Sequence, residues 1–487
     1  MKSFPLLLLG LYFSFLGFGQ VQPGLDSSFG KKGMLIDTAY NFFSIDDMTL
    51  LPDGRLLTVG NYVAQYLSDG RRDISFGKAG KFALDSAAKP KTLHGSSINL
   101  LSNGKIIVSG DTYFSNAHSN FLGGFVIRLN NNGSLDSSFG KNGVTLLDAV
   151  VQKSTIQSDG KIVTAGPISL SDYVFVNRLT ENGIVDSSFG INGWVKIWKL
   201  VNEPEILGLG ILSDGRIGVV SSDHYNVIDC RIFSNGQPDS SIGPRGFSYR
   251  VNAFYCHTAK VNSDGSVVAS IGGLNSSNDA ALAYIKTDGK LDSSIAVNGL
   301  LGVPGLLIKK LVLMTDGRLI CGGYNDSSFA VARVLNNGTG IDFSFGQNGI
   351  ITTKVAEWMD DRIHAMALQS DGKIVAAGES RKSNIVVPRA SIVRYLPDAP
   401  APPLAILPIR TIPSKLLIYP NPSNSEVIIS STEKGILEIF STDGKLMRRQ
   451  YCRNNITVID VSLLPKGSYI LSLKTTSTTQ NCTFSKL

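Results

Sequence analysis

Short runs in which apolar and polar residues alternate, separated by Asp-Gly and Asn-Gly turns, fill residues 25–396. In the third repeat, "KSTIQSDGKIVTAG" (153–166) holds two such runs around its Asp-Gly turn, and "DYVFVNRLTENG" (172–183) and "WVKIWKL" (194–200) are two more. Alternation with a period of two is typical of half-buried β-strands, and Asp and Gly close the hairpins between them. No stretch of this region has a sustained helical period. The pattern predicts an all-β fold of units with four short antiparallel strands.

The hairpin motif occurs seven times, and its turn glycines lie about 53 residues apart. They are Gly54, Gly104, Gly160, Gly215, Gly265, Gly317 and Gly372. Four antiparallel strands repeated at roughly this spacing are typical of a β-propeller, so we expect seven four-stranded blades over residues 20–396. The strand at 33–38 precedes the first complete unit, and the last unit, ending at 389–398, lacks a fourth strand. The N-terminal strand is therefore predicted to complete the seventh blade and close the ring, which removes exposed sheet edges.

A second recurring string, first present as "LDSSFGKKG" (25–33), links the third strand of each unit to the fourth. Its Asp and Ser side chains are suited to bonding the local backbone, and its Phe to filling the space between blades. Units five and six carry Ile242 and Ile295 instead of Phe, so the position requires an apolar side chain. An Arg of the third strand is expected to pair with the motif Asp. We assign these structural roles to Asp26, Phe29, Asp136, Phe139, Asp186, Phe189, Arg128, Arg178 and the hairpin residue Gly160.

Together the two motifs give the pattern "DG.i..aG……v.RL..nG.lD.sFG.nG" over about residues 25–396. This pattern resembles the delta-60 repeat family of exported bacterial proteins. The resemblance implies a propeller-like β-fold. It implies no established activity and no catalytic residues.

Residues 1–19 are typical of a secretory signal peptide, with a positive charge at Lys2, an apolar run over 4–18 and small residues around Gly19. We expect this leader to be removed on export. The apolar run is short for a membrane-spanning helix, which needs about 20 residues. No later segment is long and apolar enough, so we expect no transmembrane segment.

Residues 397–413 are rich in proline, which favours an extended linker, and residues 414–487 lack the repeat. Alternating apolar residues and turn signals in this last segment predict a small C-terminal β-sandwich. The motifs "YPNPS" (419–423), "IFSTDGKL" (439–446) and "LPKGSYILSL" (464–473), with the terminal "SKL", resemble the type A C-terminal sorting domain of the type IX secretion system.

This resemblance implies a Bacteroidetes-like source, transit of the periplasm and recognition by the type IX secretion machinery. The mature protein would then be secreted or held on the outer cell surface. An accessory β-sandwich that binds a ligand is the alternative interpretation of the segment.

The net charge of +7 does not gather in any basic run, so the composition does not indicate binding to nucleic acid. The cysteines match no zinc spacing and no known catalytic motif is present, so we expect no metal and no cofactor. We also expect the protein to be a monomer. Cys452 and Cys482 share the C-terminal segment, so the sequence allows one disulfide between them. Cys230, Cys256 and Cys321 are expected to be small buried side chains.

The connections between the second and third strands, and between the fourth and the next first strand, differ from unit to unit. Variable loops on a rigid scaffold are where binding concentrates. The segments concerned are 85–97, 111–124, 221–226, 323–328 and 356–361. The candidate ligand-binding residues in them are Tyr113, Phe114, His118, Phe121, His224, Tyr225, Tyr324, Trp358, Asp360 and Asp361.

These features predict a non-catalytic, secreted or cell-surface protein that binds a glycan or a surface protein with its variable loops. The alternative is a polysaccharide hydrolase or lyase built on a propeller, for which Asp360 and Asp361 offer two neighbouring carboxylates. Against an enzyme, no acid–base pair with a supporting residue is visible in the sequence. A passive surface scaffold is the third interpretation.

Overall fold

The chain is divided into two compact units, residues 1–403 and residues 404–487. The predicted leader and all but the first residue of the predicted linker lie outside the described residues. The computed structural model describes residues 24–38, 44–87, 91–114, 117–168, 173–199, 205–222, 226–252, 256–272, 280–296, 298–356, 359–382, 388–397, 417–419, 423–430, 435–452, 456–475 and 479–487.

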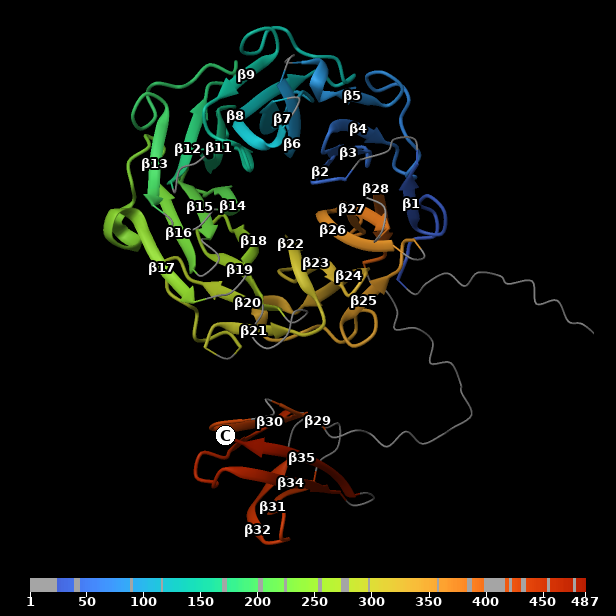
Figure 1. The fold of residues 1–487 in the computed structure, drawn as a ribbon, viewed down its shortest axis with the longest axis vertical. Coiled ribbons are helices and arrows are strands. Elements are labelled where there is room, and N and C mark those ends of the chain that lie inside the picture. The colour runs from blue at the N-terminus through green and yellow to red at the C-terminus, as the bar shows by residue number, and fades with distance from the viewer. Residues whose placement is uncertain are drawn as a thin grey trace, which may run out of the picture. The chain divides into compact units, whose positions relative to one another are not determined.

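In its described residues, the first unit contains seven four-stranded antiparallel sheets arranged in a ring (Figure 1). The first two sheets contain β2 (Asp47–Leu50), β3 (Leu56–Val59), β4 (Tyr62–Tyr66), β5 (Lys81–Ala83), and β6 (Lys91–Leu100), β7 (Ile106–Phe114), β8 (Ala117–Leu129), β9 (Val144–Leu147). The third and fourth contain β10 (Lys153–Ile156), β11 (Ile162–Pro167), β12 (Tyr173–Leu179), β13 (Trp194–Lys199), and β14 (Glu205–Ile211), β15 (Ile217–Ser222), β16 (Asn226–Ile232), β17 (Phe247–Asn252). The fifth and sixth contain β18 (Cys256–Val261), β19 (Val267–Gly272), β20 (Ala280–Ile285), β21 (Leu300–Val303), and β22 (Leu307–Leu313), β23 (Leu319–Asn325), β24 (Ser328–Val334), β25 (Ile350–Thr353). The seventh contains β26 (Met359–Leu368), β27 (Ile374–Lys382), β28 (Arg389–Tyr395) and β1 (Met34–Asp37).

The described residues contain no α-helix, only the short 3-10 turns η1 (Leu84–Ser86), η2 (Ser240–Ile242), η3 (Pro244–Gly246) and η4 (Asn336–Gly338). No helix in this part of the chain is long and apolar enough to cross a membrane. The hairpin turns have the geometry their composition requires: Gly160, between β10 and β11, has a φ of +82°, a conformation that glycine adopts without steric cost. The turn residues therefore explain where the strands stop.

The sheet that ends the first unit takes its outer strand from the start of the chain. β1 pairs antiparallel with β28, from Met34 opposite Val393 to Asp37 opposite Ala390. Asp37 also accepts a hydrogen bond of 2.8 Å from the Tyr66 hydroxyl in the first sheet. At the centre, the innermost strand of each sheet contacts that of the next, and β26 contacts β2 in the same way.

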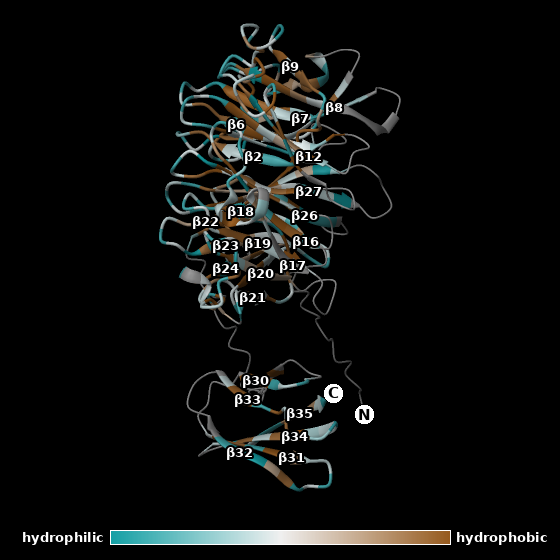
Figure 2. Ribbon diagram, turned by 90° about the vertical axis from the view of Figure 1, so that its left-hand side faces the viewer, coloured by the Kyte–Doolittle hydropathy of each residue, from teal (hydrophilic) through white to brown (hydrophobic). Residues whose placement is uncertain are grey.

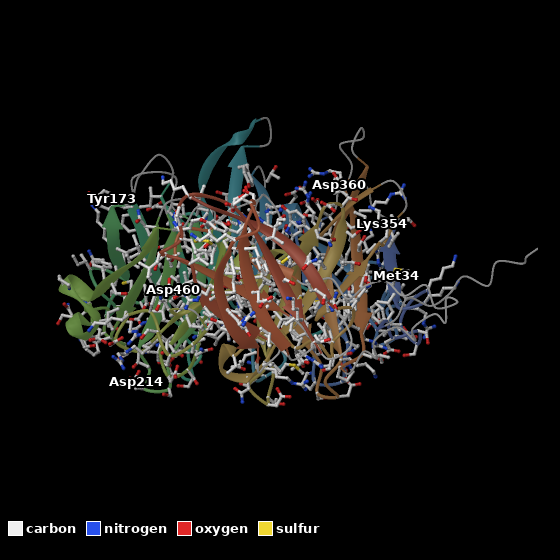
Figure 3. All side chains as sticks on the ribbon, turned by 90° about the horizontal axis from the view of Figure 1, so that it is seen from below. Met34, Tyr173, Asp214, Lys354, Asp360 and Asp460 are labelled. Atoms are coloured by element: carbon white, nitrogen blue, oxygen red, sulfur yellow. The ribbon has the colours of Figure 1, made fainter. Side chains whose placement is uncertain are left out.

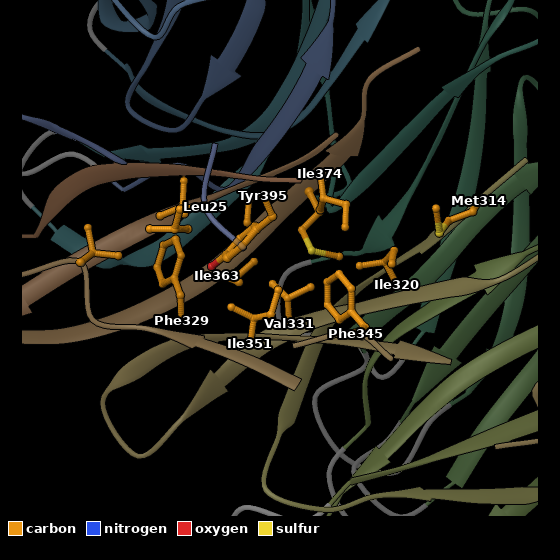
Figure 4. Close-up of a cluster of buried hydrophobic side chains, with 14 residues drawn as sticks. Leu25, Met314, Ile320, Phe329, Val331, Phe345, Ile351, Ile363, Ile374 and Tyr395 are labelled. Carbon is orange, nitrogen blue, oxygen red and sulfur yellow. The ribbon is translucent and has the colours of Figure 1, made fainter. Parts of the chain in front are cut away.

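The core of the first unit lies between the sheets. Hydrophobic residues lie mainly in the strands and hydrophilic ones mainly in the turns (Figure 2). Each buried cluster combines residues of two neighbouring sheets, as Phe329 of β24 and Ile374 of β27 do in Figure 4. The cluster around Phe29 joins the first sheet to the seventh. The motif Phe side chains are fully buried in these clusters: Phe29, Phe139, Phe189 and Phe345 each have no exposed surface.

The recurring string forms the same polar network in several sheets. Asp136 accepts hydrogen bonds from the backbone N–H and hydroxyl of Ser138, at 3.2 and 2.7 Å. Arg128 donates from Nε to Asp136 at 2.6 Å, and its guanidinium lies 4.9 Å from the centre of the Phe139 ring. The same ion pair, which the sequence suggests, joins Arg178 to Asp186, Arg333 to Asp342 and Arg394 to Asp26.

The string also holds neighbouring sheets together. Arg128 donates to the carbonyl of Glu181 in the next sheet at 2.7 Å, and the N–H of Gly140 donates to the carbonyl of Asn182 at 2.8 Å. Arg394 of the seventh sheet donates in the same way to the carbonyl of Ser68, in the first sheet, at 2.5 Å. These buried, charge-assisted contacts are stronger than neutral ones, so the repeated string stabilises the ring.

The described part of the second unit contains two sheets around one buried core. One sheet consists of β29 (Leu417–Tyr419), β30 (Glu426–Ser430) and β33 (Ile456–Asp460), and the other of β31 (Gly435–Ser441), β32 (Leu446–Cys452), β34 (Gly467–Lys474) and β35 (Thr479–Lys486). Val427 and Ile459 of the first sheet pack with Leu437 and Leu471 of the second. This is the arrangement of a small β-sandwich.

The thiols of the chain have different surroundings in the two units. Cys452 lies on β32 and the free thiol Cys482 on β35, and β31 and β34 separate these strands. Three strand spacings amount to about 14 Å, which is too far for a disulfide. Cys230, Cys256 and Cys321 are buried in the intersheet clusters, which confirms the prediction for them.

The variable connections are shorter than the sequence predicts. The expected loop 111–124 is largely strand, because β7 and β8 continue as a paired hairpin to Phe114 and from Ala117. Strand β26 likewise includes Asp360 and Asp361, and β23 extends to Asn325. The prediction of loops was wrong here because the strand extensions carry polar residues even at buried positions, such as Asp111, Thr112 and Asp361, so the apolar alternation that marks a strand is absent.

Candidate functional site

The first unit has one side formed by turns whose sequence repeats from sheet to sheet and an opposite side formed by connections whose sequence differs. Asp214, in the hairpin turn between β14 and β15, lies on one side, and Tyr173 and Asp360, at the starts of β12 and β26, lie on the other (Figure 3). The recurring string shares the side of the hairpin turns, since Lys105 of one turn bonds Asp136 at 2.7 Å. We call the opposite side, where the innermost strands begin, the variable face.

Polar side chains of two sheets meet on the variable face. His94 of β6 lies with Nε2 3.0 Å from Oδ2 of Asp46, the residue before β2. Asp111 of β7 is the strand partner of His94 and accepts a hydrogen bond from the Tyr113 side chain. Oδ1 of Asp111 is buried and has no hydrogen-bond partner in the part of the chain that the structure describes. We call Asp46, His94, Asp111 and Tyr113 the polar cluster.

A bulge and a glycine position this cluster. The register of β6 against β7 shifts between Gly95 and Ser97. Opposite, a Cβ on Gly110 would lie 1.9 Å from the carbonyl oxygen of His94, so only glycine fits there. Bulges redirect side chains and often lie near functional sites. The close approach brings His94 of one strand beside Asp111 of the other.

Burial changes the charges of the polar cluster. It raises the pKa of Asp111 to about 7, with a further increase from the charge of Asp46, although His94 and the Val151 N–H act in the opposite direction. Burial lowers the pKa of His94, but the hydrogen bond and charge of Asp46 outweigh it and the pKa is raised overall. Near neutral pH the cluster therefore combines a carboxyl group able to hold a proton with a histidine–carboxylate pair.

Replacing Asp111 with Asn is expected to flatten the dependence of stability on pH. The folded carboxyl keeps its proton up to about 7, whereas the unfolded one loses it near 3.8. The free energy of unfolding therefore falls as the pH rises between these values, by on the order of 2–4 kcal/mol, and Asp111→Asn removes this part of the decline. Urea unfolding at pH 4 and pH 8 measures it, with the exposed Asp148→Asn as control. An unchanged decline in Asp111→Asn would contradict the assignment.

A second polar group lies on the neighbouring seventh sheet. His364 Nε2 is 3.9 Å from Oε1 of Glu379, which also lies 3.7 Å from Arg381. The guanidinium of Arg362 lies 5.2 Å from the centre of the Tyr324 ring. The charge of His364 also acts on Asp46, so this group borders the polar cluster. Side chains of the first, second, sixth and seventh sheets thus meet on one part of the variable face.

The candidate ligand-binding residues predicted from the sequence do not form one site in the structure. Tyr113 and Tyr324 are half-buried in the two polar groups. Asp361 is fully buried, accepts the Val355 N–H at 2.9 Å, and has a pKa raised by burial. Asp360 precedes it on β26, so the two carboxyl groups point to opposite faces and cannot act as a pair, which corrects that interpretation. Phe114, His118 and Phe121 lie on β7 and β8, where their side chains are not described, and His224, Tyr225 and Trp358 lie outside the described residues.

The sequence predictions missed Asp46, His94, Asp111, His364 and Glu379. One signal could have found two of them: Asp111 and Glu379 directly follow the last glycine of the hairpin motif, where every unit differs. In the described residues no group of three or more His, Cys, Asp or Glu side chains is placed to hold a metal ion.

Family models match two parts of the chain. A secretion system C-terminal sorting domain matches residues 417–485. A beta-propeller domain of unknown function (DUF5122) matches residues 101–139, 157–189 and 369–398. No curated protein matches the sequence.

Solved structures similar to the chain have low sequence identity. A virginiamycin B lyase from Staphylococcus aureus is 14% identical, with a TM-score of 0.38, over 71% of this chain and 94% of the other. Drosophila semaphorin 1a is 11% identical, with a TM-score of 0.42, over 74% and 88%. YCF48 from Cyanidioschyzon merolae is 11% identical, with a TM-score of 0.41, over 75% and 99%. At these TM-scores the likenesses carry no argument about activity. The chain thus combines a β-propeller matched in three stretches by the DUF5122 family with a secretion system C-terminal sorting domain.

Proposed function

We propose that this protein is a non-catalytic binding module, delivered by the type IX secretion system, that holds a glycan or a protein on its variable face. The sorting domain implies export and secretion or attachment to the cell surface. The observation that carries the binding role is the polar cluster. His94, Asp111 and Tyr113 do not recur from unit to unit, yet they converge, and a buried oxygen of Asp111 has no partner in the described residues. Such convergent polar groups on a rigid scaffold fix the orientation of a ligand.

The scaffold in this proposal is a closed seven-bladed propeller. Its support is the pairing of β1 with β28 and the buried cluster that joins the first and seventh sheets around Phe29. A closed ring has no exposed sheet edge and holds the variable face rigid. Residues 1–19 serve as the signal peptide that starts export, and the chain then crosses the periplasm to reach the secretion machinery.

His94→Ala is expected to weaken ligand binding at least about tenfold, because a hydrogen bond to a charged group contributes about 1.5–3 kcal/mol. A glycan array probed with the purified chain identifies the ligand, and calorimetry measures the dissociation constant. Asp214→Ala, an exposed change on the opposite side of the unit, is the control. Equal affinities of the His94 variant and the parent would reject the polar cluster as the binding site.

The second candidate function is polysaccharide cleavage, and one observation favours it. Asp111, with a pKa of about 7, lies beside His94, and a carboxyl group that keeps its proton near neutral pH is suited to act as a general acid. Incubation with a panel of polysaccharides, followed by an assay for new reducing or unsaturated ends, distinguishes the two. Product release that Asp111→Asn abolishes would replace the binding role by catalysis.

A further inference from the structure

Three lysines project from the innermost strands of different sheets. Counted from the hairpin turn, Lys153 of β10 and Lys310 of β22 each form the fourth residue pair with the second strand of their sheet. Asp47 of β2 forms the fourth pair of the first sheet, so these three side chains lie at one level of the ring. Lys260 of β18 forms the second pair. Because residues two apart on a strand point to the same side, Lys260 shares the orientation of the other two lysines.

The lysines reach into a space shared by several sheets. Nζ of Lys310 lies 2.9 Å from Oδ1 of Asp47, although the seventh sheet separates their sheets. A cleft of about 440 Å³ is bounded by Lys260 and Lys310 together with Asn262, Ser263 and Met366, which come from three neighbouring sheets. These innermost strands surround the centre of the ring (Figure 1). Lys310 thus connects the cleft to Asp47, the residue that follows Asp46 of the polar cluster in the chain.

Lys153, Lys260 and Lys310 share this space with the carboxylates of Asp47 and Glu205, and the third nearby carboxylate, Asp46, is paired with His94, so positive charge is in excess. Among the described residues, Asp47 is the one ion-pair partner of Lys310, and neither Lys153 nor Lys260 has a carboxylate within ion-pair distance. Burial lowers the pKa of Lys153, the charge of Lys310 lowers it further, and Asp47, Glu205 and Asp46 act in the opposite direction. The pKa of Lys260 is lowered by burial and then by Lys310.

An excess of cations in a partly enclosed space attracts anions, because the walls have a low dielectric constant and focus the field. Neutral hydrogen-bonding groups surround the lysines: Asn99 and Thr155 occupy the same level as Lys260, and Asn262 and Ser263 border the cleft. Ammonium groups beside amides and hydroxyls match a sugar ring that carries a carboxylate or sulfate. The volume is sufficient for one such ring, at the lower end of the range of ligand pockets.

We propose that the central space binds an anionic sugar residue, a uronate or a sulfated sugar, through Lys260 and Lys310, which line the cleft, and Lys153, which lies at the level of Lys310. The proposal rests on the binding role proposed above and gives its ligand a chemical class: an acidic glycan that extends from the polar cluster into the centre of the ring. The lysines are the determinants of specificity for charge, while the polar cluster contacts the neutral part of the chain.

Calorimetry with the full chain tests this proposal with three probes at fixed ionic strength: a trimer of galacturonic acid, the neutral galactose trimer and inorganic sulfate. The acidic trimer is expected to bind at least about tenfold more tightly than the neutral one, and Lys153→Met and Lys260→Met each to weaken it by about tenfold. Lys141→Met, on the exposed recurring string, is the matched control and leaves the affinity unchanged. Two variants are used so that one folding failure does not end the test.

Equal binding of the two trimers, or unchanged affinity in both lysine variants, would overturn the proposal. Binding of sulfate alone would also overturn it, since it would show an anion site without a sugar. Failure of this proposal would not reject the binding role of the variable face, because His94→Ala can still weaken binding of a neutral glycan when the lysine variants change nothing. Binding of the acidic trimer that depends on the lysines and not on His94 would instead reject the polar cluster.

Discussion

Deletion of residues 24–38 is expected to lower the free energy of unfolding of the first unit by at least about 5 kcal/mol, measured by urea denaturation. The segment provides β1, the outer strand of the seventh sheet, and two buried side chains, Phe29 and Leu25. Loss of a buried Phe costs about 3–5 kcal/mol and of a buried Leu about 2–5 kcal/mol. The deletion also leaves Arg394 without Asp26, which lies 2.9 Å from it.

The expected loss concerns the whole unit and not one end of it. Phe29 packs in the cluster that joins the first and seventh sheets, so its removal opens the ring where the chain begins and ends. Lys31→Ala, an exposed change in the same segment, is the control and is expected to alter stability by less than about 0.5 kcal/mol. A deletion variant that unfolds at the urea concentration of the parent would contradict the closure of the ring by β1.

Arg178→Ala is expected to destabilise the first unit by about 3–5 kcal/mol, because it leaves a buried carboxylate without its partner. The Arg178 side chain is 6% exposed and lies 2.8 Å from Asp186. It also donates to the carbonyl of Ser234 in the next sheet and lies over the Phe189 ring at 4.6 Å. Thermal or urea unfolding followed by circular dichroism measures the change.

The matched control for this prediction is an exposed pair of the same kind. Arg71 lies 2.7 Å from Asp69, but its side chain is 77% exposed, so Arg71→Ala is expected to change stability by less than about 1 kcal/mol. Burial would raise the pKa of Asp186, but the bonds from Ser188 and the charge of Arg178 lower it overall. The stability from this carboxylate is present above pH 3.8 and is lost as the pH falls, so Arg178→Ala should also flatten the acid side of the stability profile. Equal losses in the two Arg variants would show that burial of the pair has no effect.

The scaffold was more predictable from the sequence than the candidate site. The Asp-Gly turns, the motif Phe and the Arg–Asp pair recur in the sequence because each copy occupies the same local structure. Asp111 and His94 do not repeat, and their contact depends on the register of β6 against β7. Asp46 comes from a different sheet, so no spacing in the sequence relates it to His94. The prediction of loops on the variable face failed for the related reason that the strand extensions there carry polar residues even at buried positions, so no apolar alternation marks them.

The sequence by itself determined the all-β fold, the four-stranded antiparallel units, their turns and the recurring string, because alternation of side chains and the conformations of Asp-Gly turns are local properties of the chain. It also determined the sorting domain, which short motifs at fixed order identify. The tertiary structure alone decided that Asp111 meets His94 and Asp46, and that Lys310 of the sixth sheet reaches Asp47 of the first. These contacts join residues far apart in the chain, and the ring of sheets brings them together by burying apolar side chains between neighbours.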